Sequence, residues 1–169
     1  MRTELFWIEG PWLGRLAIMP RPRGGDWLED EIQSWRRSGV DVVHSLLTRE
    51  EQTELTLSDD GKWCRENGIE FLSFPIVDRG TPSSSETFAE EVAKLADQLA
   101  DGKSVAVHCR QGIGRAALVA ICLLISASVE PTAAIQRVGS ARGCSVPETL
   151  DQRRWIADFA QSFAAGALG

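Results

Sequence analysis

One stretch of the sequence, SVAVHCRQGIGR from Ser104 to Arg115, most restricts how the chain can fold. Its first half is a short apolar run, which predicts a buried strand. Gly112 and Gly114 then mark a loop, and the apolar side chains that follow recur at helical spacing. A strand, a glycine-containing loop and a helix in this order direct backbone N–H groups and a helix N-terminus at one anion. The sequence therefore predicts an anion-binding loop over residues 109–115, here called the anion loop, with Cys109 at its start.

Length and composition favour one soluble domain. The 169 residues can bury a substantial core, and 43% hydrophobic with 25% charged residues is ordinary for a globular protein. The net charge of −6 argues against nucleic acid or an anionic membrane as a partner. No apolar run approaches the length of a membrane span, and the first residues lack the pattern of a signal peptide. We expect a single cytoplasmic, monomeric domain over residues 1–169, with residues 1–3 and 164–169 frayed.

The cysteines and histidines argue against a metal site. The cysteines are Cys64, Cys109, Cys122 and Cys144. They show neither a C-x-x-C pair nor the spacing of metal ligands, and His44 and His108 are the two histidines of the sequence. We expect free thiols in a reducing compartment, no metal and no cofactor.

Short apolar runs predict the strands. These runs are Leu5–Ile8, Leu16–Met19, Val40–Leu47, Ile69–Phe74 and Ser104–His108. Glycine and proline separate the first two runs, which we expect to form two edge strands joined by a turn. His44 lies inside the third run, where a histidine with a structural role is favoured over a catalytic one.

Helical patterns fill the intervals between these runs. We expect helices from Asp26 to Gly39, over Arg49–Leu55, over Asp59–Asn67, from Ser83 to Gly102, after Arg115, from Pro131 to Gly143, and from Pro147 onwards. Asp26 with Glu29, and Ser83 with Glu86, resemble capping boxes. The charges of the two short acidic helices are expected to face solvent. The buried face of the last helix is expected to comprise Leu150, Ile156, Phe159 and Phe163.

The alternation of strands and helices determines the expected fold class. It predicts an α/β domain with a central, mostly parallel sheet of about five strands and helices on both faces. The segment IVDRGTP, from Ile76 to Pro82, follows one strand and is here called the Asp78 loop. It lies where such a sheet presents its functional edge. A loop aspartate is usually a turn former, so Asp78 needs support from elsewhere in the chain.

The residues of the anion loop suit a nucleophilic reaction at phosphorus. A helix N-terminus, converging N–H groups and a guanidinium all favour the reactive thiolate of Cys109. Arg115 can offer two parallel hydrogen bonds to two phosphate oxygens, which lysine cannot imitate. His108 is expected to support the loop from beneath by hydrogen bonds. The residues expected to surround the bound anion are Arg110, Gln111, Gly112, Ile113 and Gly114.

Four segments resemble one known family. HCRQGIGR is similar to the H-C-x-x-G-x-x-R signature of the cysteine-dependent protein tyrosine phosphatases. FPIVDRGTP resembles the general-acid loop of the dual-specificity branch and has the separation from the cysteine that is typical there. VVHSLLTREE and VPETLDQRRWIADF resemble the upstream strand and the closing helix, so the resemblance spans about Val40 to Phe159. It implies a dual-specificity phosphatase fold and a metal-independent phosphatase.

The resemblance also implies a two-step mechanism. Cys109 attacks phosphorus to form a phosphocysteine while Asp78 protonates the departing oxygen, and water then hydrolyses the intermediate with Asp78 as base. Gln152 is expected either to orient that water or to be a surface glutamine. Arg79 is expected either to contact substrate or to be a solvated turn residue.

The implied substrates are phosphorylated proteins, on tyrosine or on serine and threonine, or small phosphoesters. Phosphoinositide-directed relatives usually carry lysines within the loop, and this loop has none. The family usually has Ser or Thr after the arginine, where this chain has Ala116, which predicts slow breakdown of the intermediate. A catalytically weak phospho-binding module is therefore the alternative. A sulfurtransferase would not need the distant arginine, and an arsenate reductase would need a relay of further cysteines, so both are less favoured.

Overall fold

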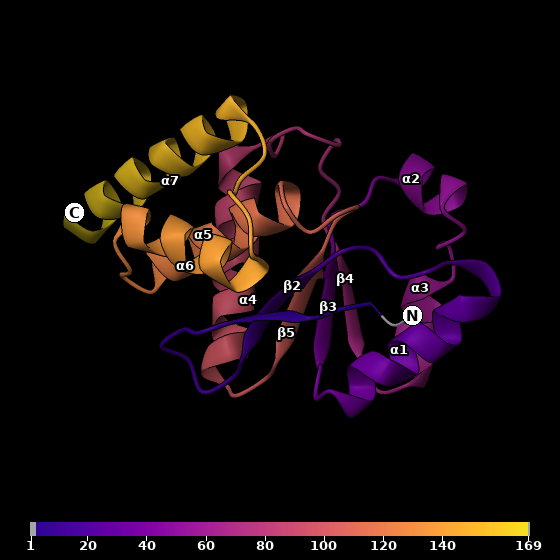
Figure 1. Ribbon diagram of the computed structural model, residues 1–169. Helices are drawn as coiled ribbons and strands as arrows, with labels where there is room; N and C mark the ends of the chain where they lie inside the picture. The colour runs from indigo at the N-terminus through magenta and orange to yellow at the C-terminus, as the bar shows by residue number, and fades with distance from the viewer. Residues whose placement is uncertain (1–2, 169) are drawn as a thin grey trace.

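The structure is a computed structural model that describes residues 3–168 (Figure 1). Within this range the chain forms one five-stranded sheet in the order β1-β2-β5-β3-β4. The strands are β1 (Phe6–Ile8), β2 (Leu16–Met19), β3 (Val42–Ser45), β4 (Glu70–Ser73) and β5 (Val105–His108). β1 is antiparallel to β2, and every other pair is parallel. The predicted α/β domain with a mostly parallel sheet of about five strands is confirmed.

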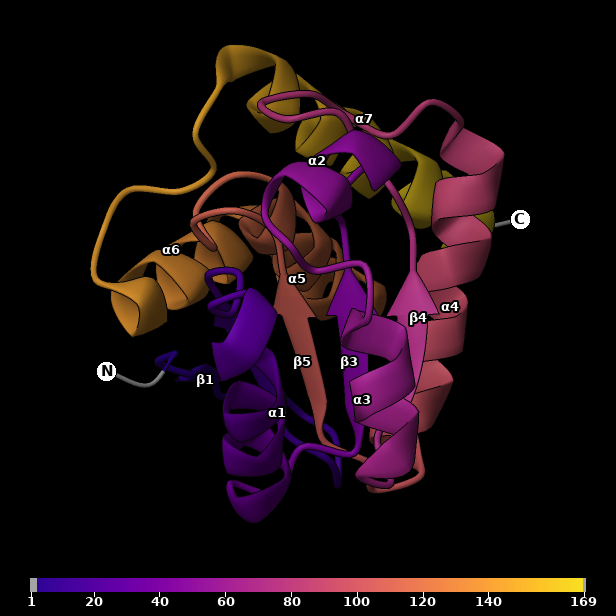
Figure 2. The same cartoon turned by 90° about the vertical axis from the view of Figure 1, so that its right-hand side faces the viewer.

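Helices cover both faces of the sheet (Figures 1 and 2). The helices are a 3-10 turn (Gly25–Trp27), α1 (Leu28–Arg37), α2 (Arg49–Glu54), α3 (Asp60–Glu66), α4 (Ser85–Ala100), α5 (Arg115–Ser126), α6 (Pro131–Arg142) and α7 (Leu150–Leu168). α1 and α3 pack on one face, and α4 to α7 lie on the other. No helix in the described range is both long and apolar enough to span a membrane.

Period-two alternation along the strands builds the two cores. Leu16 and Ile18 of β2 and Val105 of β5 point into the core shared with α4 to α7. Ala17 and Ala106, one residue away, point into the core shared with α1 and α3. Because both faces are buried, these strands are continuous apolar runs instead of alternating ones.

Three expectations about strands and helix starts are wrong. Leu16–Met19 is an interior strand, because β5 pairs with its free side. Asp26 does not cap α1, whose first turn follows a 3-10 turn and has no side-chain cap. The cap of α4 is Ser84, one residue after the expected Ser83, and it accepts a hydrogen bond from the N–H of Thr87.

Three expectations about burial and helix ends also need correction. α7 begins at Leu150 instead of Pro147, and Leu150 is 70% exposed instead of buried. Within the two short acidic helices, Glu51 and Asp60 are buried and do not face solvent. The fraying of the chain ends stays a prediction; in the structure Thr3 hydrogen-bonds the buried Glu31, and α7 continues through residues 164–168. Residues 1, 2 and 169, also expected to be frayed, lie outside the described residues.

The carboxyl ends of β3, β4 and β5 meet at one edge of the sheet, at the top of Figure 2. α2, the Asp78 loop and the anion loop follow these three strands and therefore gather at that edge. Ligands of open α/β sheets bind at this edge.

Candidate active site

The anion loop joins β5, the central strand, to the N-terminus of α5. Cys109 is almost fully buried, and its Sγ accepts a hydrogen bond from the N–H of Gly112 at 3.3 Å. Gly112 has a φ of +73°, and a Cβ there would lie 2.8 Å from the carbonyl carbon of Met19. Only glycine suits this position, and the tight curl it permits aims a backbone donor at the thiol sulfur.

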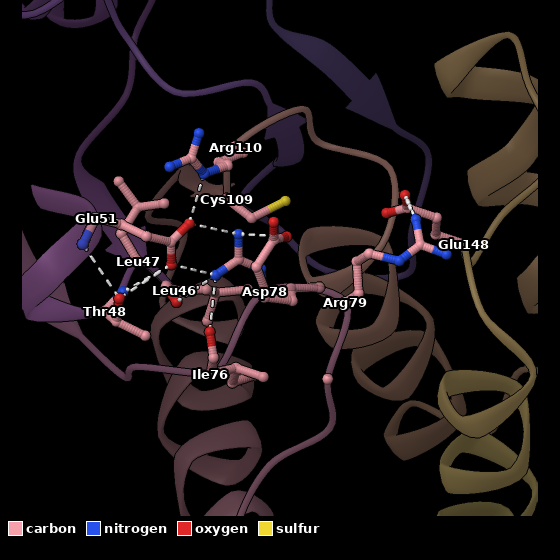
Figure 3. A network of polar contacts seen from close by, with 12 residues as sticks. Leu46, Leu47, Thr48, Glu51, Ile76, Asp78, Arg79, Cys109, Arg110 and Glu148 are labelled. Carbon is pink, nitrogen blue, oxygen red and sulfur yellow. Dashed lines mark hydrogen bonds and ion pairs between the residues drawn. The ribbon is translucent and has the colours of Figure 1, made fainter. Parts of the chain in front are cut away.

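Arg115 is a charged side chain that is only 1% exposed. Its Nη1 donates to Oε1 of Glu51 and to the carbonyl of Ile76, both at 2.7 Å. Its Nη2 donates to Oε2 of Glu51 and to Oδ1 of Asp78, both at 3.0 Å (Figure 3). The two parallel bonds to Glu51 are the bidentate geometry that fixes a guanidinium plane.

Glu51 is the central carboxylate of this network, and the sequence analysis missed it. Burial alone would raise its pKa, but hydrogen bonds from Arg115, from the N–H of Thr48 and from Arg110 lower the pKa to about 2. Thr48 and Glu51 also form a full capping box at the start of α2. That T-x-x-E pattern, in the sequence at residues 48–51, was the available signal that Glu51 is held in place.

Arg110, expected to surround the bound anion, is engaged by carboxylates of its own chain. Its Nε donates to Glu51 at 2.9 Å, and its Nη2 donates to Glu54 at 3.1 Å. The side chain thereby links the anion loop to α2. Glu51 and Glu54 therefore balance the positive charge of Arg110 on the side that faces α2.

The Asp78 loop brings a carboxylate to the same place. Asp78 is 51% exposed at its side chain and contacts Arg115 from the open side. Arg79 adopts a left-handed φ of +61° and forms an ion pair with Glu148, in the loop before α7 (Figure 3). This ion pair gives Arg79 a partner within the chain, and its side chain is still 62% exposed in the turn.

Gln152 is fully buried, so the expectation of a surface glutamine is wrong. Its Nε2 donates to the carbonyl of Gly80 at 3.1 Å, and its Oε1 accepts from the N–H groups of Glu148 and Thr149, both at 3.1 Å. The amide therefore ties the Asp78 loop to the start of α7. These contacts give both polar atoms of the amide a hydrogen-bond partner.

A pocket of about 200 Å³ opens over the thiol. Its lining residues are Asp78, Arg79, Cys109, Arg110, Gln111, Gly114, Arg115 and Glu148. Of the other residues expected around the anion, Ile113 packs against the core shared with α4 to α7, and Gly112 is buried. A larger hollow of about 480 Å³ lies between α4 and α7, but it contains none of the three candidate catalytic residues, so size does not identify the site.

His108 lies beneath the loop, as expected for a supporting residue. It is fully buried, and its Nδ1 lies 3.4 Å from the carbonyl oxygen of Cys109. The ring projects to the face covered by α1 and α3, where Trp35 is 6.2 Å away between ring centroids.

Comparison with known proteins identifies the family. Residues 17–128 match the model of the family described as "Polymorphic toxin system, DSP-PTPase phosphatase". The chain belongs to this phosphatase family. The resemblance drawn from the sequence motifs is thereby confirmed.

Individual proteins also resemble this chain in sequence or in fold. The chain is 29% identical over 140 residues to cyclin-dependent kinase inhibitor 3 of Rattus norvegicus. The matched region covers 82% of this chain and 66% of that protein. It therefore spans about two thirds of that relative's length. A kinase-associated phosphatase with serine in place of its catalytic cysteine superposes with a TM-score of 0.84 at 21% identity, covering 98% of each chain. Tk-PTP in its active form has a TM-score of 0.74 at 26% identity, covering 88% of this chain and 92% of that one.

Replacing Glu51 by Gln should destabilise the protein by about 3 kcal/mol at pH 7, because Arg115 loses its buried counter-charge. The folded-state pKa of Glu51 lies below the ordinary 4.5, so its stabilisation is complete above pH 4.5 and fades as the pH falls towards about 2. Urea unfolding at pH 7, 5 and 3 measures this. The exposed Glu50→Gln is the matched control. A difference between Glu51→Gln and wild type that stays constant with pH would contradict the assigned ion pair.

Replacing Gln152 by Met should loosen the Asp78 loop, because Gly80 loses its hydrogen-bond donor. We expect a stability loss of about 1–3 kcal/mol and faster hydrogen exchange at residues 76–82. Gln161→Met, at an exposed position of the same helix, is the control. Unchanged exchange in the Gln152 variant would show that the amide does not anchor the loop.

Proposed function

We propose that the protein hydrolyses phosphate monoesters through a phosphocysteine intermediate. The observation that carries this proposal is the convergence on one pocket of Cys109 and Arg115, from the two ends of the anion loop, with Asp78, from a separate loop. Their residue types match the nucleophile, the phosphate ligand and the general acid that such a reaction needs.

In the first step, the Cys109 thiolate attacks phosphorus and the bond from phosphorus to the leaving oxygen breaks. Arg115 and the N–H groups of the anion loop hold the non-bridging oxygens as charge redistributes in the transition state. Asp78, on the open side of the pocket, gives its proton to the departing oxygen, which leaves as an alcohol.

In the second step, water attacks the phosphocysteine, and the bond from sulfur to phosphorus breaks. Asp78, now ionised, takes a proton from that water, so the thiolate and inorganic phosphate are regenerated. The contacts of Gln152 support a role in holding the Asp78 loop in place during both steps.

The pocket supports recognition of the phosphate more than of the leaving group. Each lining residue that the structure describes is polar, glycine or cysteine, so no apolar wall sandwiches an aromatic ring. We propose phosphorylated proteins, on serine, threonine or tyrosine, or small phosphoesters as substrates.

A phospho-binding module with weak catalysis is the second candidate. Ala116, which follows the arginine, carries no hydroxyl to stabilise the thiolate as the intermediate breaks down. Such a module would use the same anion loop and would retain phosphate without turning over.

Hydrolysis of an aryl phosphate and of phosphoserine and phosphotyrosine peptides tests the function. Cys109→Ser should abolish turnover while still binding inorganic phosphate. Asp78→Asn should lower kcat by about 10²-fold or more for alkyl esters and less for aryl esters, whose leaving groups need less protonation. Cys144→Ser, at an exposed thiol, should change nothing. Equal rates for wild type and Cys109→Ser would remove the enzyme assignment.

Ala116→Ser should raise the steady-state rate, because the new hydroxyl can stabilise the departing thiolate. With an aryl phosphate, the wild-type protein should show a burst of the phenol product before a slow steady state, and the variant a smaller burst. Rapid-mixing kinetics measures both. Identical burst amplitude and turnover in the two proteins would refute slow breakdown at this position.

A further inference from the structure

His108 and Asp60 form an unusual buried pair under the anion loop. His108 ends β5, immediately before Cys109, and Asp60 begins α3 on the face that the His108 ring enters. Their side chains are 0% and 2% exposed, and His108 Nε2 lies 3.4 Å from Asp60 Oδ2. Neither atom has a hydrogen-bond partner among residues 3–168, so this ion-pair contact is the polar contact that each of them makes. Each is therefore the polar neighbour available to the other.

The ring has an oxygen atom at both ends. The carbonyl oxygen of Cys109 is 3.4 Å from Nδ1, and Asp60 Oδ2 is 3.4 Å from Nε2. A carbonyl and a carboxylate can only accept hydrogen bonds, and a neutral imidazole carries a proton on one nitrogen alone. A neutral ring would leave a nitrogen lone pair facing an oxygen lone pair. With Asp60 as a carboxylate, only the doubly protonated, cationic ring turns an N–H towards an oxygen at both ends.

The other carboxylate oxygen of Asp60 has a hydrogen-bond donor of its own. Its Oδ1 accepts from the Sγ of Cys64 at 3.6 Å. Burial, reinforced by the negative charge of Asp60, raises the pKa of the Cys64 thiol, so that thiol stays protonated and donates. A buried cation is costly unless it is paired, and Asp60 supplies the charge that His108 needs.

The other polar groups near His108 do not supply an alternative counter-charge. Trp35 of α1 contributes an N–H, a donor without charge, and Met19 of β2 is apolar. His44 of β3 faces the opposite side of the sheet and pairs with Glu91 at 3.0 Å. Burial lowers the pKa of His44, which is thus an internal contrast to His108.

We propose, building on the phosphatase function above, that Asp60 is a positioning residue that keeps His108 doubly protonated and so places a fixed positive charge beneath the anion loop. The imidazolium touches the Cys109 carbonyl, while the carboxylate lies on its far side. The positive end of the pair is therefore turned towards the thiol and the bound phosphate. A nearby cation favours the thiolate, which is the nucleophile.

Nitrogen NMR of the two histidines tests the protonation directly. In wild-type protein at pH 7.5, His108 should show protons on both ring nitrogens and His44 on one, with His44→Gln giving the assignment. Asp60→Asn, which keeps the shape but removes the charge, should leave His108 with a single ring proton. Cys64→Ala, which removes the thiol donor to the other carboxylate oxygen, should leave His108 doubly protonated. A neutral His108 in wild-type protein would overturn the assignment, even if Asp60→Asn fails to fold.

Alkylation of Cys109 by iodoacetamide across pH tests the consequence. In Asp60→Asn we expect about tenfold slower alkylation at pH 6 and a wild-type rate at high pH, since only the thiolate reacts. A purely structural role would slow alkylation equally at every pH, and that result would refute an electrostatic role. Cys144→Ser removes the exposed thiol from the background. Neither measurement requires turnover, so an inactive protein with a cationic His108 would refute the phosphatase function and leave the Asp60 assignment standing.

Discussion

The burial of a permanent positive charge at Arg115 is the constraint on which the site depends. A guanidinium out of contact with water is tolerated only when carboxylates and carbonyls satisfy it, and Glu51 supplies two of these contacts. Glu51 is in turn held by Thr48, and Ile76 and Asp78 complete the set. One side chain therefore joins α2, the Asp78 loop and the anion loop into a single unit.

The fold could be predicted largely because its signals are local. Apolar runs and helical stripes lie within single segments, and alternation between them implies a parallel sheet. The order of strands is not local. Leu16–Met19 lies in the interior because Val105–His108, about ninety positions later, pairs with it, and nothing in either run alone specifies that pairing.

The residues of the candidate site also divide into those with a local sequence signal and those without one. Cys109 and Arg115 belong to one contiguous motif, and Asp78 was identified by the resemblance of its loop. Glu51, Asp60 and Gln152 lie on helices where polar residues usually face water, and their burial depends on which loop packs over them. Capping at Thr48 could have drawn attention to Glu51, whereas Asp60 and Gln152 carry no such local signal.

The positions of the carboxylates distinguish those that hold the site in place from the one that can reach a substrate. Glu51 lies behind Arg115, and Asp60 lies behind His108, so neither blocks the open face of the pocket. Asp78 is different, because its half-exposed carboxylate contacts Arg115 from that open side. On the proposed mechanism, an arriving phosphate would compete with Asp78 for Nη2 of Arg115 and leave the buried bonds to Glu51 intact. Substrate binding would thus free the Asp78 carboxylate from the arginine, so that it can take up a proton and pass it to the leaving oxygen.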